Sequence, residues 1–273
     1  MSSCYTLRGR AAQSIEYRHM SNFALPLVCN WDHSRPPPRL ALRLSARAAL
    51  QAEDPPSWLD TGPPEKPFDL SRALRLLSED IIARTPTLAH IDISQLLFSI
   101  TRARNGRGHG LQARVTPLRF RGGALATIHR GNAYQVQRFV VNGRDILYLV
   151  TFCLPRFMNR DFEDKLVTVF HELYHISPVF DGDLRRHGGR YTAHTGSQKK
   201  YDAHMASLSK AYLKNGADTD RLAFLRLSFA QFCRRHGTVV GIHLPRPKLV
   251  RVPFTPPRQP ALPIRPSPSD THR

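Results

Sequence analysis

Cysteine is scarce in this chain, which has 273 residues but only 4 cysteines, none of them in a C-x-x-C pair. A disulfide framework or a cysteine-based zinc ribbon needs more cysteines at closer spacing, so the sequence argues against both. We expect the thiols to be reduced, which favours a cytoplasmic location. The cysteines are Cys4, Cys29, Cys153 and Cys233.

Long apolar runs are absent as well. No stretch approaches the ~18–20 apolar residues that a membrane-spanning helix needs. Residues 1–30 contain no compact apolar segment of the kind a secretory signal requires, although a targeting segment or a later start at Met20 stays open. The sequence also contains no internal repeat and no glycine-rich phosphate loop.

Acidic residues are few, with 21 Asp and Glu against 40 Lys and Arg, so the formal net charge is +19. Such an excess favours anionic partners, and it makes nucleic acid a possible partner through a basic surface. The segments that would contact phosphates are 101–107 and 184–190. The alternative interpretation is an arginine-rich composition whose basic runs are ordinary solvated loops.

Proline is rare only in the middle of the chain. Of the 22 prolines, 9 lie in residues 1–68, 7 in residues 252–273 and 6 in between. Proline removes a backbone donor and disfavours helix in the residue before it. We therefore predict a largely disordered Pro/Arg-rich region at 1–68, one folded domain at 69–251 and a disordered tail at 252–273.

Hydrophobic spacing within the domain predicts helices, then strands, then helices again, which is an α+β fold with a small antiparallel sheet. Glycine-bearing turns separate the strands, and Asn142-Gly143 is the clearest hairpin signal. The predicted helices are 69–84, 161–176, 197–214 and 219–235. The predicted strands are 95–102, 111–120, 124–129, 134–141 and 145–152, with a final strand pair at 239–242 and 249–252.

The helix at 161–176, which Asp161 is placed to cap, carries the chemistry. Its apolar residues gather on one face, whereas His171 and His175 lie roughly 40° apart on the far side. Two imidazoles four residues apart on one helical face can bind a single metal ion. Glu172 lies beside them, where it can accept a proton from water without binding the metal. The alternative is a surface helix with two solvated histidines and an incidental glutamate.

The run from Val169 to Ile176, together with the downstream residues His187, His194 and Tyr201, resembles the SprT-like zincins and the phage-type metallopeptidases related to them. The resemblance covers roughly residues 70–215. It implies a zincin-like fold, a third histidine ligand downstream and a zinc-bound water as nucleophile. SprT-like relatives act near DNA, some of them on crosslinked proteins, but the cysteine-rich zinc ribbon of some members is absent here.

A catalytic zinc needs a third protein ligand and one open position. We favour His194, because it precedes a predicted helix and element ends hold ligands better than loop centres. His187 matches the family's local pattern better, with Tyr191 in place of phenylalanine, and stays the alternative. Further candidates are Asp181, Asp183 and His204, although the simpler role of Asp181-Gly182 is a turn.

The sequence therefore predicts a zinc-dependent metallopeptidase that acts on a protein or peptide, with His171, His175 and His194 as zinc ligands and Glu172 as general base. Two other classes stay open. One is a nucleic-acid-associated protein with a structural zinc, and the other is a metal-dependent hydrolase of a non-peptide amide. Nothing in the sequence indicates the oligomeric state.

Overall fold

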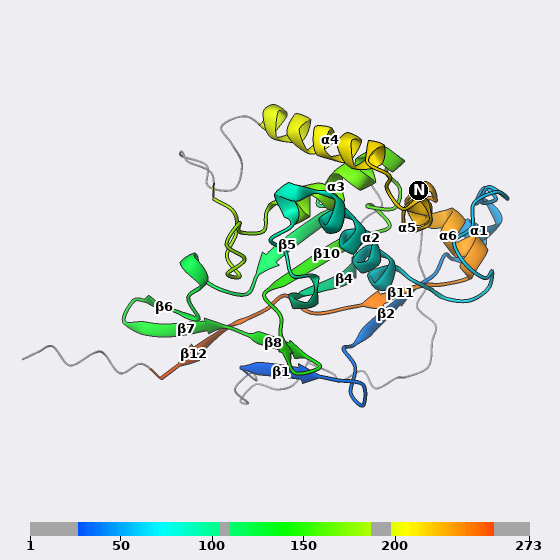
Figure 1. The fold of residues 1–273 in the computed structure, drawn as a ribbon. Coiled ribbons are helices and arrows are strands. Elements are labelled where there is room, and N and C mark those ends of the chain that lie inside the picture. The colour runs from blue at the N-terminus through cyan, green and yellow to red at the C-terminus, as the bar shows by residue number, and fades with distance from the viewer. Residues whose placement is uncertain (1–26, 104–109, 187–197, 254–273) are drawn as a thin grey trace, which may run out of the picture.

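Figure 1 shows the chain as a computed structural model, and the structure describes residues 27–103, 110–186 and 198–253. Helices and strands are both present, so the fold is α+β, as the sequence predicts. Within the described ranges, every helix is too short or too polar to cross a lipid bilayer.

The central sheet has the strand order β4-β10-β5, with β4 (Leu96–Arg102), β10 (Tyr148–Leu154) and β5 (Ala113–Pro117). Every residue of β10 is buried. β10 runs antiparallel to β5 but parallel to β4, so the prediction of a purely antiparallel sheet is wrong. Parallel strands need a long crossover. The segment between β4 and β10 provides this crossover, because its hairpin turns join strands of other sheets.

Three further sheets surround the central one, and each has three strands among the described residues. The Asn142-Gly143 turn joins β8 to β9 with both residues at positive φ, so this predicted hairpin is confirmed. The sheets are β1 (Val28–Trp31), β8 (Arg138–Val141) and β9 (Arg144–Asp145); β2 (Arg39–Leu42), β11 (Val239–Ile242) and β3 (Phe68–Asp69); and β12 (Leu249–Val252), β7 (Asn132–Val136) and β6 (Ala126–His129).

Residues 27–68 differ from the linker that their prolines predict. β1 pairs with β8 and β2 pairs with β11, while the side chains of Leu42 and Leu59 are buried. Both strands lie at the edge of their sheets, where nearby proline is tolerated. Residues 1–26 and 254–273 lie outside the described residues, so the predicted disorder of both ends and the domain limits stay predictions.

The predicted strand pair 239–242 and 249–252 is also corrected. Both strands form, but β11 joins the sheet of β2 and β12 joins the sheet of β7. Pro245 and Pro247 lie between them, and each removes a backbone donor that a tight hairpin connection would use.

Capping residues in the sequence mark where several of the helices begin. α2 (Leu70–Arg84) begins after Asp69, whose side chain accepts from Arg72 N. The helix predicted at 219–235 is interrupted, because Ser228 and Gln231 form a capping box that begins a new helix. The remaining helices are α1 (Ala46–Leu50), α3 (Phe162–Tyr174), α4 (Gln198–Lys214), α5 (Thr219–Ala223) and α6 (Phe229–His236).

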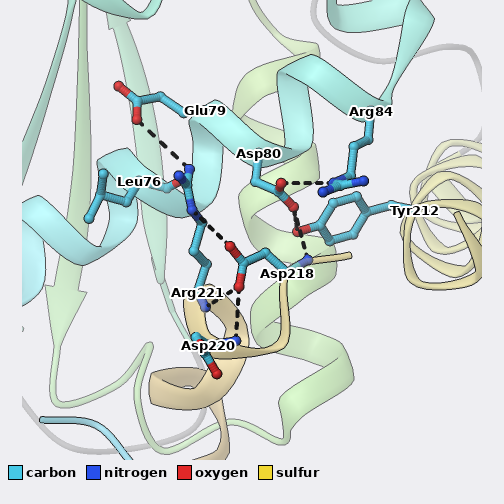
Figure 2. Close-up of polar contacts among 8 residues, drawn as sticks. All are labelled: Leu76, Glu79, Asp80, Arg84, Tyr212, Asp218, Asp220 and Arg221. Atoms are coloured by element: carbon cyan, nitrogen blue, oxygen red, sulfur yellow. Dashed lines mark hydrogen bonds and ion pairs between the residues drawn. The ribbon is translucent and has the colours of Figure 1, made fainter. Parts of the chain in front are cut away.

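A buried polar network fixes the far end of α4 against α2 (Figure 2). The Tyr212 hydroxyl donates to Asp80 Oδ2 at 2.6 Å, and Arg84 Nε donates to Asp80 Oδ1 at 2.8 Å. Arg221 Nη1 extends the network to the Leu76 carbonyl at 2.7 Å. Because α4 packs along α3 (Figure 1), this network also positions the residues of α4 that face the candidate site.

Candidate functional site

α3 forms because its sequence separates an apolar face from a polar one. Leu166, Val169, Phe170 and Leu173 are all buried in the main core, as their spacing predicts. Asp161 occupies the N-cap position, but its side chain makes no capping hydrogen bond, so its predicted role as a side-chain cap is wrong. Acidic residues in the first turn still favour this helix end through the helix dipole.

The end of α3 is held by the chain that follows it. His175 is the C-cap residue, and Ile176 then pairs with Leu184 in an isolated antiparallel bridge. Arg185 donates its backbone N–H to the His175 carbonyl and its Nε to the Tyr174 carbonyl, both at 2.7 Å. Its guanidinium also lies over the Tyr174 ring, 4.1 Å from the centroid. The last turn of the helix is therefore fixed by three contacts from one residue.

His171 and His175 point toward each other at this end of α3. Their Nε2 atoms are 2.9 Å apart, and their ring centroids are 4.6 Å apart. Tyr201 of α4 packs on both rings, with centroids 5.0 Å from His171 and 5.7 Å from His175, and its side chain is buried. The aromatic contacts restrict both imidazoles, so their nitrogens meet at one point.

Glu172 projects from the same turn into the protein and is 7 % exposed. Its Oε2 accepts a hydrogen bond of 2.6 Å from the backbone N–H of Val115 on β5. Burial raises the pKa of Glu172 to about 7, and the Val115 hydrogen bond and the nearby Arg114 charge oppose this rise only in part. A cation bound beside the carboxylate would lower that pKa.

The acidic residues considered as ligands have other partners. Asp181 Oδ1 accepts from the backbone N–H of Asp183 at 3.1 Å, which is the turn role expected for it. Asp183 binds the Arg186 side chain at 3.0 Å and the Gly122 N–H at 3.2 Å. Arg185 and Arg186 of the basic run 184–190 are thus engaged within the fold.

The favoured third ligand, His194, and its alternative, His187, both lie outside the described residues, as does Tyr191. His204 of α4 packs against the Tyr174 ring at a centroid distance of 5.3 Å. Across residues 27–103, 110–186 and 198–253, no three metal-binding side chains gather in one place. The described part of the site therefore contains two imidazoles and one carboxylate, and a third ligand stays a prediction.

Sequence reasoning missed three residues that shape the site: Arg114, Val115 and Arg185. Val115 binds Glu172 through a backbone N–H, which no side-chain pattern can signal. The two residues are 57 positions apart, and only the pairing of α3 with the edge of the sheet brings them together. Arg185 belongs to the basic run 184–190, but its side chain binds the Tyr174 carbonyl and lies over the Tyr174 ring at the end of α3.

Two imidazoles four residues apart on a helix, with a carboxylate on the residue after the first of them, are typical of metal-dependent hydrolases. The chain belongs to the family described as "Putative phage metallopeptidase", which matches residues 68–209. No curated protein matches the chain, and no solved structure matches it. Membership of this family implies a metallopeptidase with a metal cofactor and a peptide substrate.

The donor set at the end of α3 suits such a metal. The two Nε2 atoms already meet at 2.9 Å, and the rings that carry them are held from α4. Glu172 Oε2 accepts its hydrogen bond from the Val115 N–H. Neutral imidazoles suit divalent transition metals rather than Mg²⁺ or Ca²⁺, which prefer oxygen ligands.

Proposed function

We propose that the chain is a zinc-dependent peptidase of the zincin type, whose zinc is bound by His171, His175 and His194. The observation that carries the proposal is the 2.9 Å approach of the His171 and His175 Nε2 atoms. Two nitrogens of a tetrahedral zinc shell are about 3.3 Å apart, given Zn–N bonds of ~2.0–2.1 Å, so a small ring movement accommodates the ion.

Bound at these nitrogens, zinc would supply Lewis acidity, which lowers the pKa of water and polarises the carbonyl to be cleaved. His194 is the third ligand in this proposal, and His187 is the alternative. Both follow the described hairpin that folds back onto α3 through Ile176 and Leu184.

Glu172 acts as the general base in this proposal. Its carboxylate takes a proton from the attacking water and returns it to the leaving amine. The Val115 N–H donates to Oε2 at 2.6 Å, so the carboxylate of Glu172 is already held in one position. Its burial also keeps bulk water from screening the charge of the carboxylate.

The edge of β5 provides a place for an extended peptide. Gln112 O accepts from Cys153 N, so Gln112 and every second residue after it turn their backbone groups toward β10. Ala113 and Val115 turn theirs the other way, where the Val115 N–H binds Glu172 and no described strand pairs with the edge. Edge strands of this kind bind peptides by adding a strand. A peptide paired there would pass directly beside Glu172.

Metal analysis combined with an activity assay tests the proposal. We expect near one equivalent of zinc in the purified chain, and casein cleavage that a chelator abolishes. Glu172→Gln should keep its zinc while activity falls by ~10²–10⁴-fold, because only proton transfer is lost. His194→Ala should lose zinc as well as activity. His129→Ala, an exposed histidine on β6, is the matched control and should change neither.

Four outcomes would count against the proposal. Unchanged metal content in a His171→Ala/His175→Ala double variant would remove the site. Loss of zinc from Glu172→Gln as readily as from His194→Ala would make Glu172 a ligand or a fold element. Full zinc in His194→Ala combined with loss in His187→Ala would move the third ligand to His187. Retained activity after Glu172→Gln would favour a structural metal instead.

A further inference from the structure

β5 presents a polar stripe next to the candidate site. Side chains alternate along a strand, so Gln112, Arg114 and Thr116 share one face of the sheet. Ala113 and Val115 lie on the opposite face, which is buried in the main core beside α3. The polar stripe therefore lies on the face of the sheet away from α3, along the edge strand.

Each residue of this stripe has a buried polar atom that finds no hydrogen-bond partner among the described residues. These atoms are Gln112 Oε1, Arg114 Nε and Thr116 Oγ1. Buried polar atoms are rarely left unpaired, and such a group calls for an explanation such as an absent ligand. Three of them at alternate positions of one edge strand indicate a ligand that follows the strand.

Arg114 is the charged member of the stripe. It forms no ion pair with any carboxylate of the described residues, unlike Arg119 and Arg138, which share Asp145. Its place relative to Glu172 is set by the backbone, since the peptide N–H between Arg114 and Val115 is the group that Glu172 accepts. Burial raises the pKa of the Cys153 thiol on β10, and the charges of Arg156 and Arg114 oppose this rise, so Arg114 lies near Cys153.

From this geometry we propose that Arg114 selects an acidic side chain in the substrate, next to the bond that is cleaved. The inference rests on the proposed peptidase function. If a peptide strand pairs antiparallel with the outer groups of Ala113 and with the carbonyl of Val115, whose N–H binds Glu172, Arg114 occupies a non-hydrogen-bonded position. The residue opposite Arg114 then approaches to about 4.5 Å between Cα atoms, the closer of the two spacings. Opposite charges at such a position attract across strands.

Gln112 and Thr116 lie two residues to either side of Arg114 and face the diagonal neighbours of the acidic residue. Their unpaired oxygens accept hydrogen bonds, and the Thr116 hydroxyl also donates one. The stripe thus favours polar residues around the acidic one, whereas an apolar substrate would leave all three groups buried and unpaired.

Matched peptides test this inference. Fluorogenic peptides that differ only in Asp, Asn or Lys at each position around the cleaved bond are compared by kcat/KM. We expect one position where Asp is preferred over Asn by about tenfold, the size of one charge-assisted hydrogen bond. Arg114→Gln should remove that preference, Arg114→Lys should restore part of it, and Arg114→Glu should shift it to Lys.

Binding gives a second readout that needs no turnover. In the Glu172→Gln background, labelled Asp and Asn peptides should differ in affinity by a similar factor, and Arg114→Gln should make them equal. Arg130→Gln, an exposed arginine in the turn between β6 and β7, removes the same charge and should keep the preference. Circular dichroism of each variant shows whether it folds, and the Gln and Lys variants suffice if the Glu variant does not.

The outcomes separate the two proposals. Efficient cleavage of the peptides with no acidic preference at any position would overturn the role of Arg114 and leave the peptidase function intact. An acidic preference that survives Arg114→Gln would also overturn it. Equal loss of the preference in Arg130→Gln would assign it to diffuse charge. Cleavage of no peptide by the zinc-loaded chain would overturn both proposals.

Discussion

The contact between Tyr212 and Asp80 holds the far end of the helix that covers the two histidines, and its removal should measurably weaken the fold. The Tyr212 hydroxyl donates to Asp80 Oδ2 at 2.6 Å, and both side chains are buried. Burial alone would raise the pKa of Asp80, but the hydrogen bonds from Tyr212, Arg84 and the Asp218 N–H outweigh it and lower that pKa. At neutral pH Asp80 is therefore a charged acceptor and Tyr212 its donor.

The expected magnitude follows from this chemistry. A hydrogen bond to a charged group contributes about 1.5–3 kcal/mol. Tyr212→Phe removes the donor without changing the ring that packs 5.7 Å from Phe170, so it should cost about that amount in the free energy of unfolding. This is a large share of a typical stability of about 5–15 kcal/mol. Asp80→Asn should lower the free energy of unfolding by a similar amount, because it removes the charge of the side chain without changing its shape.

Urea unfolding at pH 7 of the wild type, both single variants and the double variant gives the coupling energy of the pair. We expect at least about 1 kcal/mol, and a coupling below about 0.5 kcal/mol would refute the reasoning. Acid provides a second check. Because the folded-state pKa of Asp80 is lowered, its contribution is present above the unfolded value of about 3.9 and is lost as the pH falls through the folded value. The difference between wild type and Asp80→Asn should therefore shrink below about pH 4.

Two further predictions concern the groups around α3. Val115→Pro removes the N–H that binds Glu172, so kcat on casein should fall by about tenfold or more relative to Val115→Ala. The alanine variant loses packing but keeps the N–H. Equal kcat values for the two variants would exclude a role of this N–H in holding Glu172. Lys165 is buried with its Nζ on the Leu227 carbonyl, and burial lowers its pKa to about 8 from 10.5. The unfolded chain binds the extra proton between these values, so thermal or urea stability should rise from about pH 8 to about pH 10 in the wild type but not in Lys165→Met.

Local patterns account for what the sequence predicts correctly. The helices α2 and α4 need only an apolar repeat and flanking caps or breakers, and both lie within one stretch of chain. The core face of α3 follows from the same repeat. The helix predicted at 219–235 fails for a local reason too, because Ser228 and Gln231 satisfy the backbone of a new helix start.

Strand pairing could not be predicted in the same way. The alternation of β4, β5 and β10 shows that they are strands, but the partner of each strand depends on where the long connections run. β10 pairs in parallel with β4 across a separation of 52 residues between Ser99 and Thr151, whose hydroxyls are hydrogen-bonded. β1 and β2 lie in a region whose prolines predict a linker, and only their tertiary partners make them strands.

The candidate site could likewise be predicted only where its residues are close together in the sequence. His171, Glu172 and His175 are close in the chain, so their spacing alone indicates metal chemistry. The features that would suit the carboxylate to the proposed role of base come from elsewhere in the chain: the Val115 N–H fixes its position, and burial against the sheet raises its pKa. The rings of the two histidines are likewise oriented by Tyr201, whose helix is held at its other end by Asp80. The motif specifies which groups are present, whereas the sheet edge and α4 determine how they are aimed, so substitutions far from the motif should alter the chemistry without touching its residues.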